Sequence, residues 1–140
     1  MVAEMTLTPV QRDALLAAAN AAMARAHAPY SHFHVGAAVL DAQGRIHAGC
    51  NVENAAYPQG VCAEAGALSA MVLAGGTAVQ AVLVVGNGEG LVTPCGGCRQ
   101  KIREFASPYT PILIANPQQV RASFTLEELL PHSFGPEHLG

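Results

Sequence analysis

The pattern of apolar and polar positions divides the chain into segments typical of alternating helices and strands. The first is an alanine-rich segment that we expect to form a helix from Pro9 to about His27. Thr8 is suited to cap this helix, because its side chain can accept a hydrogen bond from the backbone N–H of Gln11, whose side chain can bond back to the cap. Proline is favoured in the first turn, where its missing N–H costs nothing. The sequence therefore predicts a helix that starts directly after Thr8.

The next segments predict a hairpin, a loop and a second helix. Residues 34–40 and 45–52 have strand-like patterns, and the Asp-Ala-Gln-Gly sequence between them is typical of a turn. Residues 53–61 contain Asn, Pro and Gly without periodicity, so we expect a loop there. A helix should follow from about Cys62 and end at a pair of glycines.

The second half of the chain predicts three more strands. Residues 81–85 form a continuous run of apolar residues, which favours a strand covered on both faces. After a further loop, a helix is expected over residues 95–105. Residues 111–115 and 120–124 should pair antiparallel, because the four residues between them are too few for a parallel crossover. Residues 125–131 begin with a second capping box and predict a last short helix.

These elements predict an α/β fold, a three-layer α/β/α sandwich with a mixed five-stranded sheet. The 140 residues, of which 51% are apolar, suit a single domain spanning residues 1–140. Only 12% of the residues are charged, against roughly 25% in a typical soluble protein, so part of the surface is expected to be covered by other subunits. The net charge of -3 and the scattering of the 7 Lys and Arg residues argue against binding of polymeric nucleic acid.

The cellular location also follows from charge and hydropathy. Residues 1–5 carry an acid where a signal peptide would carry bases, and no apolar run approaches the ~18 residues that a membrane span needs. We therefore expect a cytoplasmic protein without a membrane partner. In that compartment its four cysteines should stay reduced and be free to bind metal or to react.

The spacing of the cysteines indicates a metal site. Cys95 and Cys98 form a CxxC motif, which alone also fits a redox motif, half of a structural zinc site or coincidence. Cys62 likewise stands where a loop gives way to a helix, and helix starts stabilise thiolates. Three thiolates with one open position are typical of a catalytic zinc. Cys50 could close a structural four-cysteine site instead, but its place inside a strand pattern favours a small buried apolar residue.

Glu64 is the candidate proton carrier. It stands two residues after Cys62, and such a pair can converge only at the start of a helix. There it could take a proton from a water held by zinc, protonate a ring nitrogen and assist the departure of ammonia. The simpler alternative is a charge that only favours the first helical turn. The three cysteines around it favour the catalytic role.

The two cysteine-containing segments resemble those of a known protein family. Residues 62–64 (Cys-Ala-Glu) and 94–100 (Pro-Cys-Gly-Gly-Cys-Arg-Gln) resemble the signature of zinc-dependent nucleoside deaminases. Residues 30–38 and 49–57 are similar to segments of cytidine deaminases of the short, three-cysteine, homotetrameric type. The resemblance implies hydrolytic deamination of cytidine and deoxycytidine to uridine and deoxyuridine in pyrimidine salvage, with one Zn²⁺ per chain bound by Cys62, Cys95 and Cys98.

The resemblance also implies how a nucleoside would be bound. Phe33 is expected to pack on the pyrimidine face, while Asn51 and Glu53 hydrogen-bond the ribose hydroxyl. Because Asn51 and Glu53 are two residues apart at a strand end, they face the same side, and an amide with a carboxylate suits a sugar hydroxyl. Both nucleosides carry the 3′-hydroxyl that this pair would bind, so both are expected substrates. The base edge is expected to contact Glu64, the backbone N–H of Ala63 and, nearby, Tyr57.

Two further positions bear on the resemblance. Phe134 lies in residues 129–135, which match the segment that reaches a neighbour's pyrimidine site, so the resemblance implies a homotetramer with shared active sites. Taken alone, such an aromatic residue would be a local packing anchor. Ala65 departs from the family, whose three-cysteine members typically carry Arg there. Arg99 and the two helix starts remain to offset the thiolate charge.

Two other functions remain as alternatives. One is a related deaminase acting on another amino-heterocycle, such as the blasticidin S type, which also resembles the two cysteine segments. Phe33, Asn51 and Glu53 favour a nucleoside over that substrate. The other is a non-catalytic domain in which zinc is a structural clip.

Overall fold

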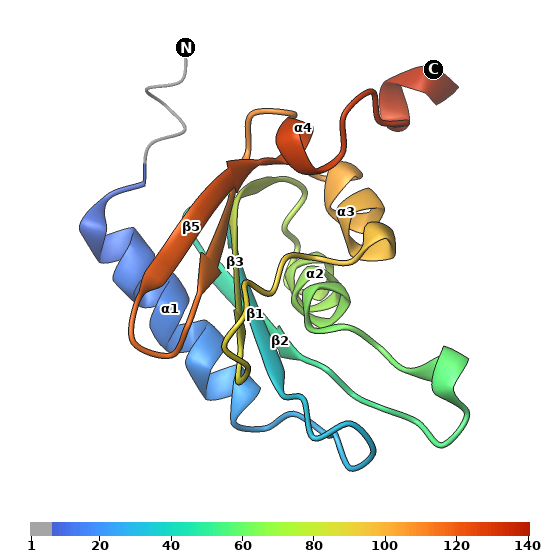
Figure 1. The fold of residues 1–140 in the computed structure, drawn as a ribbon. Coiled ribbons are helices and arrows are strands. Elements are labelled where there is room, and N and C mark those ends of the chain that lie inside the picture. Colours follow the sequence, from blue (N-terminus) through green and yellow to red (C-terminus); the bar gives the residue numbers. More distant parts are fainter. Residues whose placement is uncertain (1–6) are drawn as a thin grey trace.

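The computed structural model describes residues 7–140, so residues 1–5, whose charge disfavours an export signal, lie outside the described part. Figure 1 shows a twisted sheet with helices on both faces. Among residues 7–140, no helix has the length and apolar content needed to cross a membrane. In chain order the elements are α1 (Pro9–Met23), β1 (Val35–Asp41), β2 (Ile46–Cys50), the 3₁₀ helix η2 (Tyr57–Gln59), α2 (Ala63–Leu73), β3 (Val79–Gly86), α3 (Gly96–Arg103), β4 (Pro111–Ala115), β5 (Val120–Thr125), α4 (Leu126–Leu129) and the 3₁₀ helix η3 (Pro136–Leu139).

The start of α1 matches the prediction and its end does not. The Gln11 N–H donates to Thr8 Oγ1 at 3.1 Å, and the Thr8 N–H donates to Gln11 Oε1 at 2.9 Å, which completes the capping box. The helix ends at Met23 rather than near His27. The His27 N–H instead donates to Asn51 O at 3.0 Å, and His27 O accepts from the Glu53 N–H at 2.8 Å. Pairing with the segment after β2 therefore replaces the last helical turn.

The sheet is mixed, as predicted, with the strand order β2-β1-β3-β4-β5. β1 pairs antiparallel with both β2 and β3, and β3 pairs parallel with β4. β4 and β5, which are joined by a short connection, form the expected antiparallel pair. β3 is the middle strand of the sheet, and α3 lies in the connection between β3 and its parallel neighbour β4.

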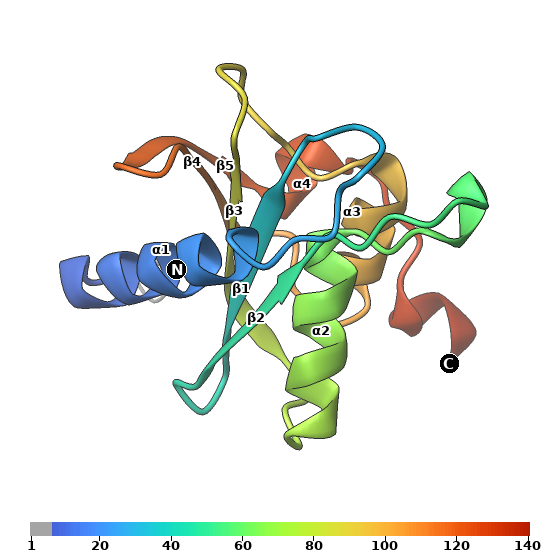
Figure 2. The ribbon, with the colours of Figure 1, turned by 90° about the horizontal axis from the view of Figure 1, so that it is seen from below.

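The helices cover both faces of the sheet, which gives the predicted three layers. Figure 2 shows α1 on one side of the sheet and α2 with α3 on the other. Alternate residues of β3 enter the two cores: Leu83 and Val85 join the cluster under α1, whereas Val82 and Val84 join the cluster under the other helices. This division explains why β3 is apolar at every position of its inner part. The helical residues buried in the cores include Leu15 and Ala19 of α1, Ala67 and Met71 of α2, and Ile102 of α3.

Two glycines allow helices to approach the β1–β2 hairpin closely. A Cβ on Gly36 would lie 2.0 Å from Ala19 O of α1, and a Cβ on Gly49 would lie 2.4 Å from Ala67 N of α2. Neither space could hold a side chain without moving a helix backbone. Gly49 therefore sets the distance between β2 and α2.

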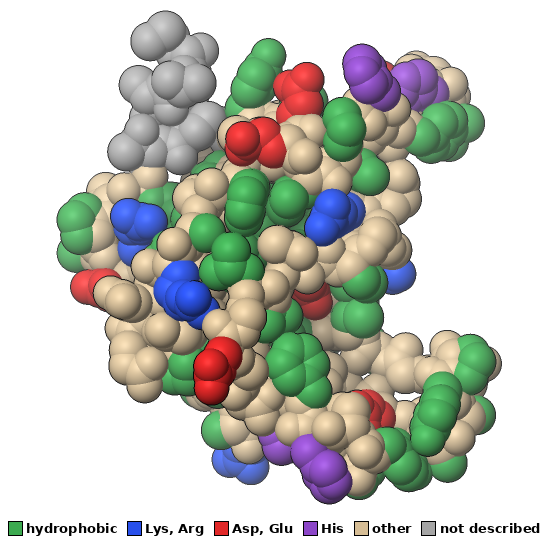
Figure 3. Space-filling model, in the orientation of Figure 1, with side chains coloured by type: hydrophobic (Ala, Val, Ile, Leu, Met, Phe, Trp, Pro, Cys, Tyr) green, Lys and Arg blue, Asp and Glu red, His purple; other side chains and the backbone are tan. Residues whose placement is uncertain are grey.

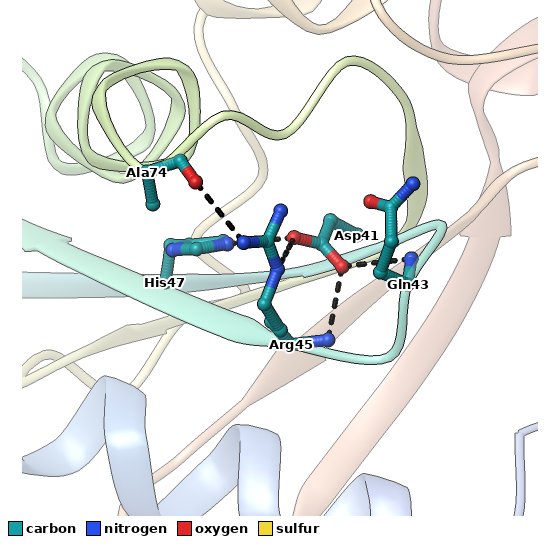
Figure 4. A network of polar contacts seen from close by, with 5 residues as sticks. All are labelled: Asp41, Gln43, Arg45, His47 and Ala74. Carbon is teal, nitrogen blue, oxygen red and sulfur yellow. Dashed lines mark hydrogen bonds and ion pairs between the residues drawn. The ribbon is translucent and has the colours of Figure 1, made fainter.

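A buried polar network joins the hairpin to the end of α2 (Figure 4). The fully buried carboxylate of Asp41 accepts hydrogen bonds from the N–H groups of Gln43 and Arg45 and from Arg45 Nε, each at 2.9 Å, and lies 2.8 Å from His47 Nε2. Arg45 Nη1 donates to Ala74 O at 3.0 Å. Burial alone would raise the pKa of Asp41, but the hydrogen bonds from His47, Arg45 and Gln43 and the charge of Arg45 outweigh it and lower the pKa to about 2.

Candidate active site

Three cysteines converge where α2 and α3 begin. Cys62 is the N-cap residue of α2, Cys95 is the N-cap residue of α3, and Cys98 is buried in the first turn of α3. Their Sγ atoms all lie within 4.8 Å of one another, and those of Cys62 and Cys95 are 3.9 Å apart. A tetrahedral zinc with Zn–S bonds of about 2.3 Å requires sulfurs about 3.8 Å apart. The donor set and its spacing therefore fit a zinc ion.

The fold brings these thiols together because α2 and α3 cover the same face of the sheet and contact each other. Both N-cap residues have extended backbone angles, so the chain enters each helix from a loop with the cysteine at the exposed end. Cys50 is half-buried on β2, opposite Gly36 of β1. Within residues 7–140, the group of side chains able to hold a metal consists of Cys62, Cys95 and Cys98.

The electrostatics of the cluster favour a bound cation. Burial raises the pKa of Cys98, and the nearby Glu64 and Cys62 raise it further. Burial also raises the pKa of Cys62, whereas the backbone N–H of Cys98 lowers the pKa of Cys95. Three thiolates and a carboxylate in one place repel one another, and a divalent metal ion is the partner that offsets this repulsion.

Glu64 is buried beside the thiols, at the second position of α2. Burial raises the pKa of Glu64, opposed by a hydrogen bond with its own backbone N–H, by one with Cys98 and by the charge of Lys101. The start of the helix is what allows this convergence: in the helix interior, residues two apart point to different sides.

Arg99, expected to offset the thiolate charge, follows Cys98 directly in α3, and its guanidinium is held in place by neutral groups. The guanidinium of Arg99 donates to three oxygens: Pro94 O at 2.7 Å, Leu129 O at 2.7 Å and Thr93 Oγ1 at 3.2 Å. These bonds fasten the loop before α3 to the end of α4. Lys101 is the cation whose charge acts on Glu64. Lys101 and Ala65 both line a hollow of about 730 Å³ between α2 and α3.

Glu53 belongs to a second group of polar residues. Its carboxylate accepts hydrogen bonds from the N–H of Tyr30 at 3.0 Å, from the N–H of Ser31 at 3.2 Å and from the Ser31 hydroxyl. The bond from Ser31 is the main reason that the pKa of Glu53 is lowered. The sequence assigned no role to Ser31, and the only available signal was its place in the segment that resembles the family. These residues line a hollow of about 310 Å³ together with Asn54, Tyr57 and Gly60.

Asn51 ties the start of β1 to the loop before it. Its Oδ1 accepts from the Val35 N–H at 2.8 Å, and its Nδ2 donates to Phe33 O at 2.8 Å. One lone pair of Oδ1 and one hydrogen of Nδ2 remain for another partner. The ring of Phe33 packs near Gly86 and Gly88, where β3 ends.

The remaining predicted contact residues are placed as follows. Ala63 is fully buried as the first residue of α2, where backbone N–H groups have no partner within the helix. Tyr57 is exposed on η2, with its ring centroid 5.9 Å from that of Tyr30. Phe134 lies on the C-terminal tail, where its backbone O accepts a hydrogen bond from Gln100 Nε2 of α3 at 2.9 Å, and its ring stacks on His138 with the centroids 5.1 Å apart.

Comparisons with known proteins identify the family and similar folds. Residues 9–113 match the family model described as the cytidine and deoxycytidylate deaminase zinc-binding region. A cytidine deaminase of Sporosarcina psychrophila is 41% identical over 127 residues, which are 91% of this chain and 93% of the relative. The crystal structure of a cytidine deaminase from Burkholderia pseudomallei superposes with a TM-score of 0.81 at 41% identity, covering 91% of this chain and 100% of that one. That of Mycobacterium tuberculosis gives a TM-score of 0.74 at 39% identity, covering 88% and 96%.

Proposed function

The chain belongs to the cytidine and deoxycytidylate deaminase family, and on that premise we propose that it is a zinc-dependent cytidine deaminase, a single domain that hydrolyses cytidine and deoxycytidine to uridine and deoxyuridine and ammonia. The observation that carries the proposal is the cluster of Cys62, Cys95 and Cys98 with Glu64 buried beside it. Among residues 7–140 no fourth side chain joins this group, and three thiols with an open position fit a catalytic rather than a structural zinc.

Zinc and Glu64 would have different roles in the reaction. Zinc held by the three cysteines would supply a Lewis acid that makes water nucleophilic near neutral pH. Glu64 would accept the proton of that water, pass it to the ring nitrogen N3 and then assist the departure of ammonia from C4. Its burial keeps bulk water away from the proton that it carries.

The substrate would lie between the cysteine cluster and the hollow beside Glu53. The Glu53 carboxylate and the free valences of the Asn51 amide would bind the ribose hydroxyl, with Ser31 holding the carboxylate in place. The Phe33 ring would pack on the pyrimidine. At the base edge, the Ala63 N–H would donate a hydrogen bond alongside Glu64, with Tyr57 nearby.

The setting proposed for the enzyme is pyrimidine salvage in the cytoplasm. Nucleosides released by nucleic acid turnover are available there, and the reducing environment keeps three adjacent thiols from forming disulfides. We also propose that the enzyme is a homotetramer whose subunits share active sites, with Phe134 of one subunit covering the base bound by a neighbour.

The test is a Glu64→Gln variant assayed with cytidine by loss of absorbance at the cytidine band. Because the amide cannot carry the proton, kcat should fall by about 10²–10⁴-fold while zinc content and thermal stability stay unchanged. Glu104→Gln, which neutralises an exposed carboxylate on the neighbouring helix, is the matched control and should keep full activity. Near-normal turnover in Glu64→Gln would remove Glu64 from the mechanism, and zinc without any cytidine hydrolysis in the unaltered protein would favour a structural clip.

A further inference from the structure

The C-terminal tail is fastened to the helix that carries two of the zinc-site cysteines. Arg103 is the last residue of α3 and only 8% exposed. Its Nε donates to Ser133 Oγ at 2.8 Å, and its Nη2 is paired with the carboxylate of Glu137. One turn earlier, Gln100 Nε2 donates to Phe134 O at 2.9 Å. Contacts at Ser133, Phe134 and Glu137 therefore hold this segment along one side of α3.

Gly135 lies against the guanidinium of Arg103, and its lack of a side chain makes this contact possible. A Cβ at this position would lie 2.4 Å from Arg103 Cζ and 2.5 Å from both terminal guanidinium nitrogens. The backbone of Gly135 therefore packs directly on the guanidinium plane, where a larger residue would displace it. The Gly135 N–H also donates to His138 Nδ1 at 3.0 Å, which holds the imidazole in its stack with Phe134.

The result is an aromatic side chain that is exposed but fixed in place. Phe134 is 55% exposed although its backbone and its ring are both held. The last residues of a domain are usually poorly ordered unless other contacts hold them. A buried guanidinium paired with an exposed glutamate contributes little to stability, because desolvation of the guanidinium is costly. The effect of Arg103 that matters is therefore the ordering of the tail.

We propose that Arg103 is a positioning residue that holds the tail on α3, so that the ring of Phe134 is preorganised to cover the pyrimidine bound by a second copy of this chain. This inference rests on the proposed role of Phe134. A tail ordered before assembly loses less conformational entropy when it docks than a mobile one would. Arg103 would therefore act on nucleoside binding through Phe134 and leave the chemical step alone.

The test compares KM for cytidine in Arg103→Met, Phe134→Ala and the double variant. An aromatic contact is worth ~0.5–1.5 kcal/mol, so Phe134→Ala should raise KM by up to about tenfold. Arg103→Met should raise KM to a similar extent, with kcat and zinc content unchanged, and should add nothing in the Phe134→Ala background. Arg103→Lys, which keeps the charge toward Glu137, should recover part of the loss.

Two milder variants distinguish a loss of the tail contacts from a general loss of folding. Glu137→Gln removes the negative charge that pairs with Arg103, and Gly135→Ala introduces a methyl group against the guanidinium. Both should raise KM and speed hydrogen–deuterium exchange in a peptide covering residues 131–140. Glu127→Gln, which neutralises an exposed carboxylate in a hollow that Arg103 and Glu137 also line, is the control and should do neither.

The outcomes separate this inference from the proposed function. If Phe134→Ala raises KM but Arg103→Met, Glu137→Gln and Gly135→Ala leave it unchanged, the positioning role of Arg103 is wrong and the shared site stands. Equal increases from Arg103→Met in both backgrounds would also overturn it, because Arg103 would then not act through Phe134. If Phe134→Ala has no effect, the proposed role of Phe134 fails and the inference fails with it, even if exchange shows that Arg103 orders the tail.

Discussion

Four cysteines of identical chemistry occupy two kinds of environment in this chain. Cys62, Cys95 and Cys98 lie at helix starts with their sulfurs turned toward one another, whereas Cys50 belongs to a strand. Serine is a much poorer zinc ligand than thiolate, so a Cys→Ser change at any of the three clustered positions should release the metal. Cys50→Ser should keep one zinc per chain, as measured by metal analysis of the purified variants. Loss of zinc from Cys50→Ser, with full retention in one of the others, would contradict the assignment.

Single residues show where sequence reasoning succeeds and where it ends. The clustering of Cys62, Cys95 and Cys98 was predictable because the CxxC spacing and the two helix starts are local signals. The bonds from Tyr30 and Ser31 to Glu53 were not, since they join residues more than 20 positions apart through loops without periodicity. For Asn51, the strand-end position indicated which way it faces but could not reveal that its amide already binds two backbone groups.

The same distinction holds for the elements. The start of α1 depends on Thr8 and Gln11, three residues apart, and was predicted correctly. Its end depends on where His27 finds backbone partners, and these lie on the segment after β2. The antiparallel pair of β4 and β5 followed from the length of its connection alone. The order of the other strands requires tertiary packing that no local pattern contains.

The close approach of α2 to β2 makes Gly49 a sensitive position. In Gly49→Ala the new methyl group would lie 2.4 Å from Ala67 N, so α2 must shift and carry Cys62 and Glu64 with it. Overpacking of this kind costs typically ~1–3 kcal/mol. We expect urea unfolding to show that loss, together with reduced zinc content and kcat.

Gly90→Ala is the control for that substitution. A Cβ there meets nothing within 4 Å and the backbone needs no left-handed angle, so stability should be unchanged or slightly higher. Equal stability of the two variants would mean that α2 is not set by contact with Gly49.

The hairpin network predicts a dependence of stability on pH. The pKa of Asp41 is lowered from 3.8 to about 2 in the folded chain, so the folded state binds its proton less readily than the unfolded state. Its contribution is therefore complete above pH 3.8 and is lost as the pH falls toward 2. Asp41→Asn should lower the free energy of unfolding at pH 7 by about 1.5–3 kcal/mol, because it removes charged hydrogen bonds.

The same variant should also flatten the acid limb of the stability profile, measured by urea unfolding between pH 5 and pH 2. Asp13→Asn, at an exposed position of α1, is the control and should preserve both the stability at pH 7 and the acid limb. A profile for Asp41→Asn that falls as steeply as that of the unaltered chain would show that other carboxylates cause the acid transition.

At the scale of the whole molecule, several large apolar side chains are exposed on the surface. Leu73 at the end of α2 is 91% exposed, and Tyr57 on η2 and Phe134 on the tail are also largely accessible. In Figure 3 the surface is hollowed between the C-terminal tail and the projecting segment that contains η2. With only 12% charged residues, this shape suits contact with further copies of the chain better than contact with water alone.

Assembly of the chain into a homotetramer can be tested without relying on activity alone. Light scattering should give four times the chain mass of 14.4 kDa at assay concentration. Phe134→Ala should remain assembled and keep its zinc, because a single ring on the tail is a small part of the contact between subunits, but its KM for cytidine should rise by up to about tenfold. Val10→Ala, which removes an exposed apolar side chain from α1, provides the matched control and should leave KM unchanged. A monomer with full activity at assay concentration would exclude a shared site, because Phe134 could then cover only a base bound by its own chain.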